Sequence, residues 1–195
     1  MSFTILCGGC FECSAKESYS RKGAKLYIGR MFELKPISPE AIPVALSKVE
    51  RYRLLNEPWQ AESICRDILR IEPEHETALV MLLLSLTDQF GTGVTAAQAR
   101  EVLVRLKGGY ERAYYAGIIS ERWADSLIRK GSPGVGFIAY EALREAMGHY
   151  ERAEALRPEG NDDALLRWNT CARILMRNND LRPRGEEVFE PALED

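Results

Sequence analysis

The sequence predicts an all-helical protein whose helices pack one after another along the chain. Two segments, AESICRDILRIEPE and AMGHYERAEALRPE, carry residues at the same steps of 4, 3 and 5. The positions are Ala61, Cys65, Ile68 and Pro73 in the first, and Ala146, Tyr150, Ala153 and Pro158 in the second. Steps of four and three place side chains on one helix face, and a proline then ends the helix because it lacks an N–H.

Length and composition agree with that fold class. With 195 residues, of which 46% are hydrophobic, the chain can bury one core or a short row of stacked helices that shares one. The net charge of -3 argues against nucleic acid as a bulk ligand. No apolar run reaches the roughly 18 residues of a membrane span. An odd number of cysteines, five, argues against a disulfide framework, so we expect a cytoplasmic protein. From its charge and its lack of a long apolar run, we expect it to bind neither nucleic acid nor membrane.

Further helices are expected around the first repeated segment. A helix from about Pro43 to Leu55 should precede it, with NEP as the turn and Asn56 as the N-cap of the next helix. After Pro73, the segment EHETALVMLLLSL predicts a helix with an apolar face. The residues of that face are Ala78, Leu79, Leu82 and Leu86.

The second half of the chain continues the pattern less regularly. TAAQAREVLVRLKGGY predicts a helix with Ala99, Leu103 and Leu106 on one face that ends at Gly108 and Gly109. ERAYYAGIISERWADSLIRK predicts another helix, in which Tyr114 and Gly117 take a bulky and a small place. Ala61 and Ala146 are 85 residues apart, about 2.5 periods of 34, so roughly half a period is inserted near the loop GSPGVG.

One more helix is expected in NDDALLRWNTCARILMRNN. Asn161 or Asp162 should cap it, and it should end before Pro183. Its inward places fall on Leu165, Trp168 and Ala172. Because no partner helix follows, it should act as a terminal capping helix.

These spacings resemble the tetratricopeptide repeat, a helix-turn-helix unit, over residues 39–181. The resemblance implies an alpha solenoid of about three repeats plus a C-terminal capping helix, and the alternative is another irregular helical array. In the family, the first helix of each repeat lines a concave groove that holds a protein segment. The resemblance therefore implies a non-catalytic protein-interaction scaffold that binds an extended or helical segment.

Register with that family places several arginines in the groove. The inner-face positions are Glu50 and Arg53, then Val80, Leu84 and Thr87, then Arg112, Tyr115 and Arg122, and finally Arg167, Thr170 and Arg173. Guanidinium groups suit carboxylates, so we expect an acidic peptide as the guest, with Tyr115 as an aromatic platform. The alternative is that these arginines are solvated or pair with Glu111, Glu121 and Asp163.

The two ends of the chain differ from its middle. Residues 1–30 carry five basic side chains against two acidic ones and show no helical or strand period, so we expect a disordered or non-native extension before Met31. Residues 182–195 form an acidic tail expected to be flexible, in which Val188, Phe189 and Leu193 alternate with glutamates. We expect this tail to fold back onto the basic groove and compete with outside ligands.

The remaining motifs give little support for catalysis. CGGCFEC places Cys7, Cys10 and Cys13 at metal-ligand spacing, but a closed zinc site needs a fourth ligand. GSPGVG matches no phosphate-binding pattern, and neither of the two histidines has a nucleophile motif beside it. We therefore expect no enzyme activity and no cofactor. The alternative function is a cysteine-based metal-binding or redox protein with a helical body.

Overall fold

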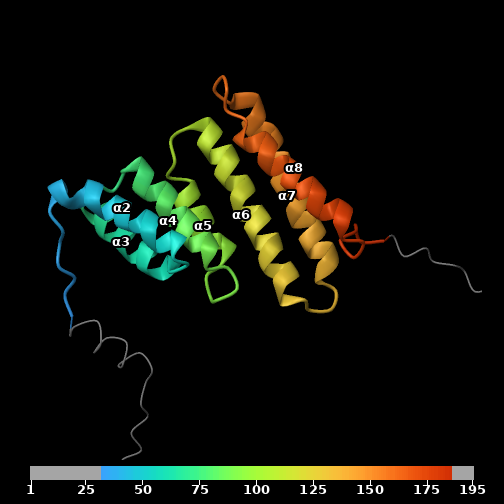
Figure 1. Ribbon diagram of the computed structural model, residues 1–195, viewed down its shortest axis with the longest axis horizontal. Coiled ribbons are helices and arrows are strands. Elements are labelled where there is room, and N and C mark those ends of the chain that lie inside the picture. The colour runs from blue at the N-terminus through green and yellow to red at the C-terminus, as the bar shows by residue number, and fades with distance from the viewer. Residues whose placement is uncertain (1–31, 186–195) are drawn as a thin grey trace, which may run out of the picture. The chain divides into compact units, whose positions relative to one another are not determined.

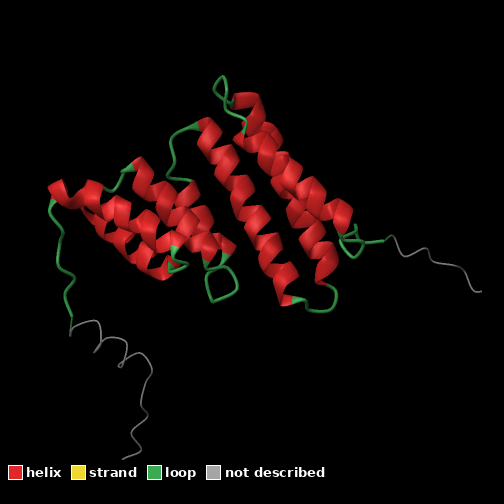
Figure 2. Cartoon of the chain, in the orientation of Figure 1, coloured by secondary structure: helices red, strands yellow, loops and turns green. Residues whose placement is uncertain are grey.

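The computed structural model describes residues 32–185 as helices joined by short loops (Figures 1 and 2). The chain divides into two compact units, Met1–Lys35 and Pro36–Asp195, and the helices described within residues 32–185 belong to the second. A 3-10 turn η1 (Pro39–Ala41) comes before the α-helices. These are α2 (Ile42–Leu54), α3 (Pro58–Ile71), α4 (Glu76–Asp88), α5 (Ala96–Leu103), α6 (Gly109–Lys130), α7 (Val135–Leu156) and α8 (Asp163–Arg177).

The seven α-helices within residues 32–185 pack mainly in sequential order. Each helix from α2 to α8 contacts the next one along the chain, and α4 also contacts α2 and α6 (Figure 1). The prediction of an all-helical chain with sequential packing is confirmed. None of the helices within residues 32–185 combines the length and the apolar character that a membrane span requires.

The repeated spacing marks two buried helix faces. Ala61, Cys65 and Ile68 of α3 are completely buried, and so are their counterparts in α7, Ala146, Tyr150 and Ala153. Each helix ends two residues before its proline, α3 at Ile71 and α7 at Leu156. The apolar face of α4 is buried as predicted. Burial of these faces is the main source of helix stability, since short isolated helices are marginal in water.

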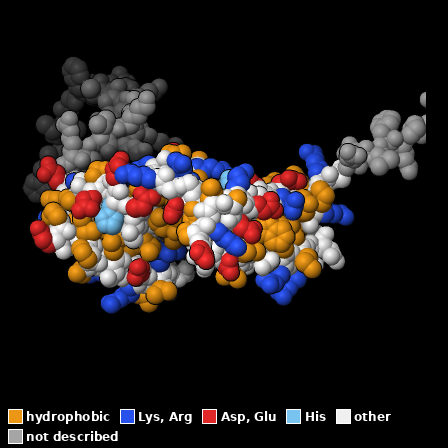
Figure 3. All heavy atoms as spheres, turned by 90° about the horizontal axis from the view of Figure 1, so that it is seen from above, with side chains coloured by type: hydrophobic (Ala, Val, Ile, Leu, Met, Phe, Trp, Pro, Cys, Tyr) orange, Lys and Arg blue, Asp and Glu red, His pale blue; other side chains and the backbone are white. Residues whose placement is uncertain are grey.

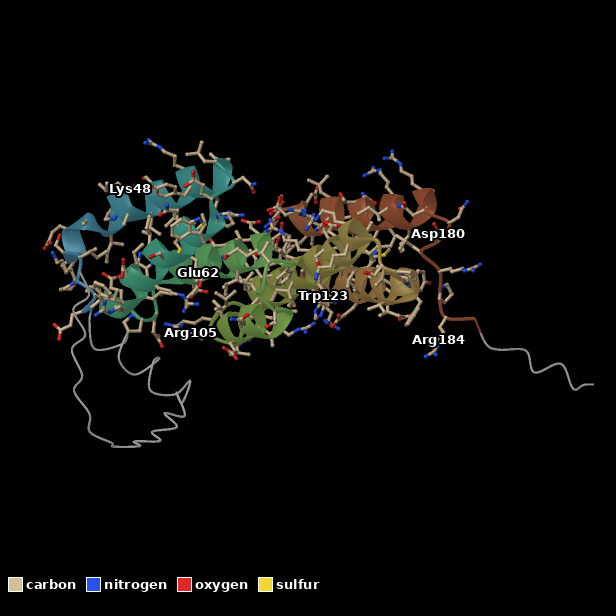
Figure 4. The ribbon with its side chains drawn as sticks, turned by 90° about the horizontal axis from the view of Figure 1, so that it is seen from below. Lys48, Glu62, Arg105, Trp123, Asp180 and Arg184 are labelled. Atoms are coloured by element: carbon tan, nitrogen blue, oxygen red, sulfur yellow. The ribbon has the colours of Figure 1, made fainter. Side chains whose placement is uncertain are left out.

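Two main cores share the row of helices. One lies among α2, α3, α4 and α5 and includes Ile119 of α6, and the other lies among α6, α7 and α8. Leu84, Tyr115 and Trp123 pack against both. Trp123 accordingly lies near the middle of the row (Figure 4). The joint between the cores is therefore the interface of α6 with α4 and α5.

The predicted end of helix α5 is wrong. Helix α5 ends at Leu103, and Gly108 and Gly109 begin α6 instead of ending α5. Leu106 is buried although it lies outside any helix. The segment after α5 is bound to the α3–α4 turn instead, because the Arg105 side chain donates to the Pro73 carbonyl and the Lys107 N–H donates to the Glu76 carboxylate.

Asn56 follows the C-terminus of α2 and is not the N-cap of α3, so its predicted role is wrong. Its φ of 59° lies in the left-handed region, which asparagine tolerates better than most residues. The Asn56 N–H donates to the Arg53 carbonyl and the Glu57 N–H donates to the Tyr52 carbonyl, which is the Schellman pattern at a helix C-terminus. Glu57 occupies the N-cap position of α3 without a side-chain capping bond.

The two helices on either side of GSPGVG are the longest in the described part of the chain. Helices α6 and α7 each have 22 residues, compared with 13 for α2 and 14 for α3. GSPGVG is the turn between them, as predicted, and α7 begins within it at Val135. The extra length therefore adds buried interface between α6 and α7.

The last helix is α8, and its buried face differs from the prediction. Ala164 and Cys171 are buried, whereas Trp168 and Ala172 are only partly buried. Asp162 holds the N-cap position, but the Asn161 side chain accepts the Asp163 N–H at 3.0 Å. No further helix follows α8 up to residue 185. The expected flexibility of residues 1–30 and of most of the acidic tail concerns residues outside the described part of the chain.

Candidate binding cleft

Two of the predicted groove arginines converge on one carboxylate. The Nε atom of Arg53 on α2 donates to Asp88 Oδ2 at 2.8 Å, and Nη1 of Arg122 on α6 donates to Oδ1 of the same aspartate. Nη1 of Arg122 also reaches the Thr87 hydroxyl at 2.7 Å and the Leu84 carbonyl at 3.2 Å. Asp88 at the end of α4 therefore joins three helices.

Arg53, Asp88 and Arg122 line a polar cleft of about 520 Å³. Its wall contains Arg53, Arg122 and Arg129 together with Asp88 and Asp125. Burial raises the pKa of the Asp125 carboxyl, and nearby arginines oppose that shift. Burial also lowers the pKa of the Arg122 guanidinium, while Asp88 opposes that shift. The cleft thus holds an excess of arginines in a partly desolvated setting, where ionic contacts are stronger than in bulk water.

The cleft arginines keep hydrogen-bonding capacity. A guanidinium has five N–H donors, and within residues 32–185 Arg53 uses only Nε and Nη1, while Arg122 uses only Nη1. No buried side-chain nitrogen or oxygen in the described part of the chain lacks a partner, so the remaining donors face solvent. They are available to a carboxylate from outside.

Arg167 lies on the same side but is bound differently. Its Nη1 donates to Glu121 Oε1 at 3.1 Å, and the Tyr150 hydroxyl donates to Oε2 of that glutamate. Glu121 is only 3% exposed, so this is a buried carboxylate shared by α7 and α8. Of the three acidic residues predicted to pair with groove arginines, only Glu121 does so among the described residues. It lies on α6 and pairs with an arginine of α8, not with one of its own helix. Arg167 therefore ties the last helix to α6.

The other predicted groove residues lie outside the cleft. Arg112 and Arg173 are exposed and have no side-chain partner among residues 32–185. Tyr115 is half-buried between the two cores, with Tyr114 edge-on at 5.2 Å between ring centroids. Burial raises the pKa of Tyr115 to about 12. Its ring is a packing group more than an open platform.

Sequence reasoning missed Asp88, Asp125 and Arg129. Arg122, Asp125 and Arg129 follow one another at steps of three and four, which is the signal of a shared helix face. Asp88 had no such signal, because its partners are 34 and 35 residues away. On the face shown in Figure 3, acidic and basic side chains are interspersed.

His75 and the described cysteines have structural settings. His75 Nδ1 accepts the Ala78 N–H at the start of α4. Cys65 and Cys171 are buried free thiols, and burial raises the pKa of each to about 12. Residues 32–185 contain no group of three or more His, Cys, Asp or Glu side chains arranged for a metal ion. The candidate metal ligands Cys7, Cys10 and Cys13 lie outside the described residues.

Comparison with protein-family models, with curated proteins and with solved structures finds no match to this chain. The functional argument therefore rests on the cleft and on the packing of the helices around it.

Proposed function

We propose that this protein is a non-catalytic, tetratricopeptide-like scaffold that binds an acidic protein segment. The binding surface is the side of the helical row where α2, α4, α6 and α8 carry Arg53, Asp88, Arg122 and Arg167. The alternation of these helices with α3, α5 and α7 supports the repeat assignment. The buried reduced thiols Cys65 and Cys171 suit a cytoplasmic setting.

The observation that carries the proposal is the sharing of Asp88 by two arginines. One carboxylate cannot satisfy two guanidinium forks, so Arg53 and Arg122 retain donors at the open side of the cleft. Their side chains are 20% and 21% exposed, which leaves them reachable yet shielded from bulk water. A guest carboxylate would complete the arrangement, with Arg129 as a third cation.

Direct binding to a defined peptide tests the proposal. The probe is a fluorescein-labelled dodecapeptide with four glutamates in a glycine and glutamine background, and its partner control has glutamine in place of every glutamate. Fluorescence anisotropy should show binding of the acidic probe alone, and added salt should weaken that binding. Failure of the acidic probe to bind at low salt would overturn the proposal.

Arginine variants then locate the site. Arg53→Gln and Arg129→Gln should each weaken binding roughly fivefold, since a partly exposed charged hydrogen bond is lost. Arg112→Gln and Arg173→Gln are matched controls, because these arginines are exposed and lie outside the cleft. Equal losses in all four variants would show a general charge effect and contradict the assignment of the cleft.

A further inference from the structure

A second hollow adjoins the polar cleft. It has a volume of about 340 Å³ and is lined by Glu50, Arg53 and Leu54 of α2 and by Met81 of α4. Arg53 lines both spaces, and its Nη1 lies 4.0 Å from the Met81 sulfur. The two spaces are therefore neighbours with one guanidinium between them.

The hollow offers apolar surface that the folded chain leaves uncovered. Leu54 is 88% exposed at the end of α2, and Met81 is partly buried beside it. A thioether adapts its shape to different apolar partners. An apolar side chain inserted here would cover Leu54, and burial of apolar area stabilises the complex.

The polar cleft and the hollow differ in the charge of the residues that line them. The polar cleft contributes arginine donors on one side of Arg53, whereas Glu50 places a carboxylate at the hollow on the other side. Like charges placed close together oppose binding. A guest should therefore place its acidic residue in the cleft and avoid a second acidic residue next to Glu50.

We infer that the guest is a peptide segment that carries a bulky apolar side chain two residues from a carboxylate. In an extended segment, side chains two positions apart point to the same side and lie about 7 Å from each other. The apolar side chain enters the hollow of Leu54 and Met81, and the carboxylate meets Arg53 and Arg122. This inference rests on the proposed function and adds the recognition pattern of its ligand.

Three labelled peptides test the pattern on the full chain. The first is a nine-residue peptide in a glycine and glutamine background, with a leucine two residues from its one glutamate. The second separates the leucine and the glutamate by six positions, and the third replaces the leucine with glutamine. The first peptide should bind about tenfold tighter than the other two because it alone can fill both spaces.

Two neighbouring leucines give a matched pair of variants. Leu54→Asn should remove the advantage of the first peptide and leave the glutamine-substituted peptide unaffected. Leu55→Asn should change neither, since Leu55 is also exposed but does not line the hollow. Glu50→Gln should improve binding of a peptide with glutamates on both sides of its leucine and not of the first peptide.

The outcomes separate this inference from the proposed function. Binding that depends on Arg53 but gains nothing from the leucine would overturn the inference alone. Equal effects of Leu54→Asn and Leu55→Asn would overturn it too. Sedimentation of the free protein adds a check, because a dimer that is lost in Leu54→Asn would assign the hollow to a second copy of the chain and overturn the inference. If no acidic peptide binds, both proposals fail.

Discussion

Tyr150 of α7 lies directly against Gly117 of α6. A Cβ atom built on Gly117 would lie 2.4 Å from Cε1 of the Tyr150 ring, far inside van der Waals contact. The ring cannot easily retreat, because it is completely buried and its hydroxyl donates to Glu121. Glycine at this position lets the two longest helices approach closely.

Gly117→Ala should destabilise the protein by about 1–2 kcal/mol. Overpacking costs about 1–3 kcal/mol, and the better helix propensity of alanine offsets up to about 1 kcal/mol of it. Gly148→Ala is the matched control on α7, since no atom lies within 4 Å of its added Cβ, and it should stabilise the protein slightly. Urea denaturation of both variants measures the difference. A Gly117→Ala variant as stable as Gly148→Ala would contradict the tight contact.

The second prediction concerns the buried carboxylate that holds α8. Arg167→Met leaves Glu121 with the Tyr150 hydroxyl as its one remaining partner among residues 32–185. Removing one partner of a buried pair costs about 3–5 kcal/mol, and we expect about 2 kcal/mol here because Arg167 is partly exposed. Adding Glu121→Gln should recover part of that loss, since the buried charge is gone. Arg173→Met on the exposed side of α8 is the control and should change the free energy of unfolding little.

The helices themselves were largely predictable from the sequence. The steps that link Ala61, Cys65 and Ile68 predict burial of one helix face, and the following Pro73 indicates where that helix ends. Leu106 shows the limit of this reasoning. An apolar residue at helical spacing is buried, but its backbone need not be helical when tertiary bonds such as that from Arg105 to Pro73 hold the segment.

The candidate site was predictable only in part. Arg53, Arg122 and Arg167 were placed on one side by register, and they do lie on α2, α6 and α8 with carboxylate partners. Their carboxylate partners lie on other helices, so no short spacing in the sequence indicates which arginine pairs with which acidic residue. The same register gave equal weight to Arg112, which is exposed outside the cleft.

The third prediction is a loss of stability at alkaline pH. Burial raises the pKa of Cys65 and Cys171 to about 12, whereas thiols in an unfolded chain have a pKa of about 8.5. Below that pH both states are protonated and the thiols contribute no pH dependence. Above it the unfolded state loses protons first, so the free energy of unfolding falls as pH rises.

Urea denaturation at pH 7, 8.5 and 10 measures this effect. We expect a fall of about 1–3 kcal/mol between pH 8.5 and 10, and tyrosines, which titrate at about pH 10 in an unfolded chain, contribute only at the upper end of that window. The double variant Cys65→Ala with Cys171→Ala should show a flatter profile over the same range. A profile as steep as that of the parent chain would assign the alkaline loss to other groups.

The last prediction concerns competition by the chain's own acidic tail. The final described residues, Asp180 to Gly185, line a hollow of about 600 Å³ together with Ile128 and Gly131 at the end of α6. Arg129, on the same turn of α6, lines the polar cleft. Along the α6 axis, Arg122 lies about two turns, or about 10 Å, from Arg129. The ten residues that follow Gly185 can span about 33 Å. The tail can therefore reach the cleft and bring its glutamates to the arginines.

A triple variant tests this competition by replacing three tail glutamates with glutamine: Glu186→Gln, Glu187→Gln and Glu190→Gln. It should bind the acidic dodecapeptide about three to five times more tightly than the parent chain. The reason is that an internal competitor lowers the apparent affinity in proportion to the fraction of clefts that it occupies. Hydrogen exchange at residues 86–90 and 122–129 should rise in that variant. The control carries the same number of changes at exposed glutamates elsewhere, Glu72→Gln, Glu101→Gln and Glu159→Gln. Equal affinity and exchange in the two triple variants would show that the tail does not occupy the cleft, while peptide binding itself would stand.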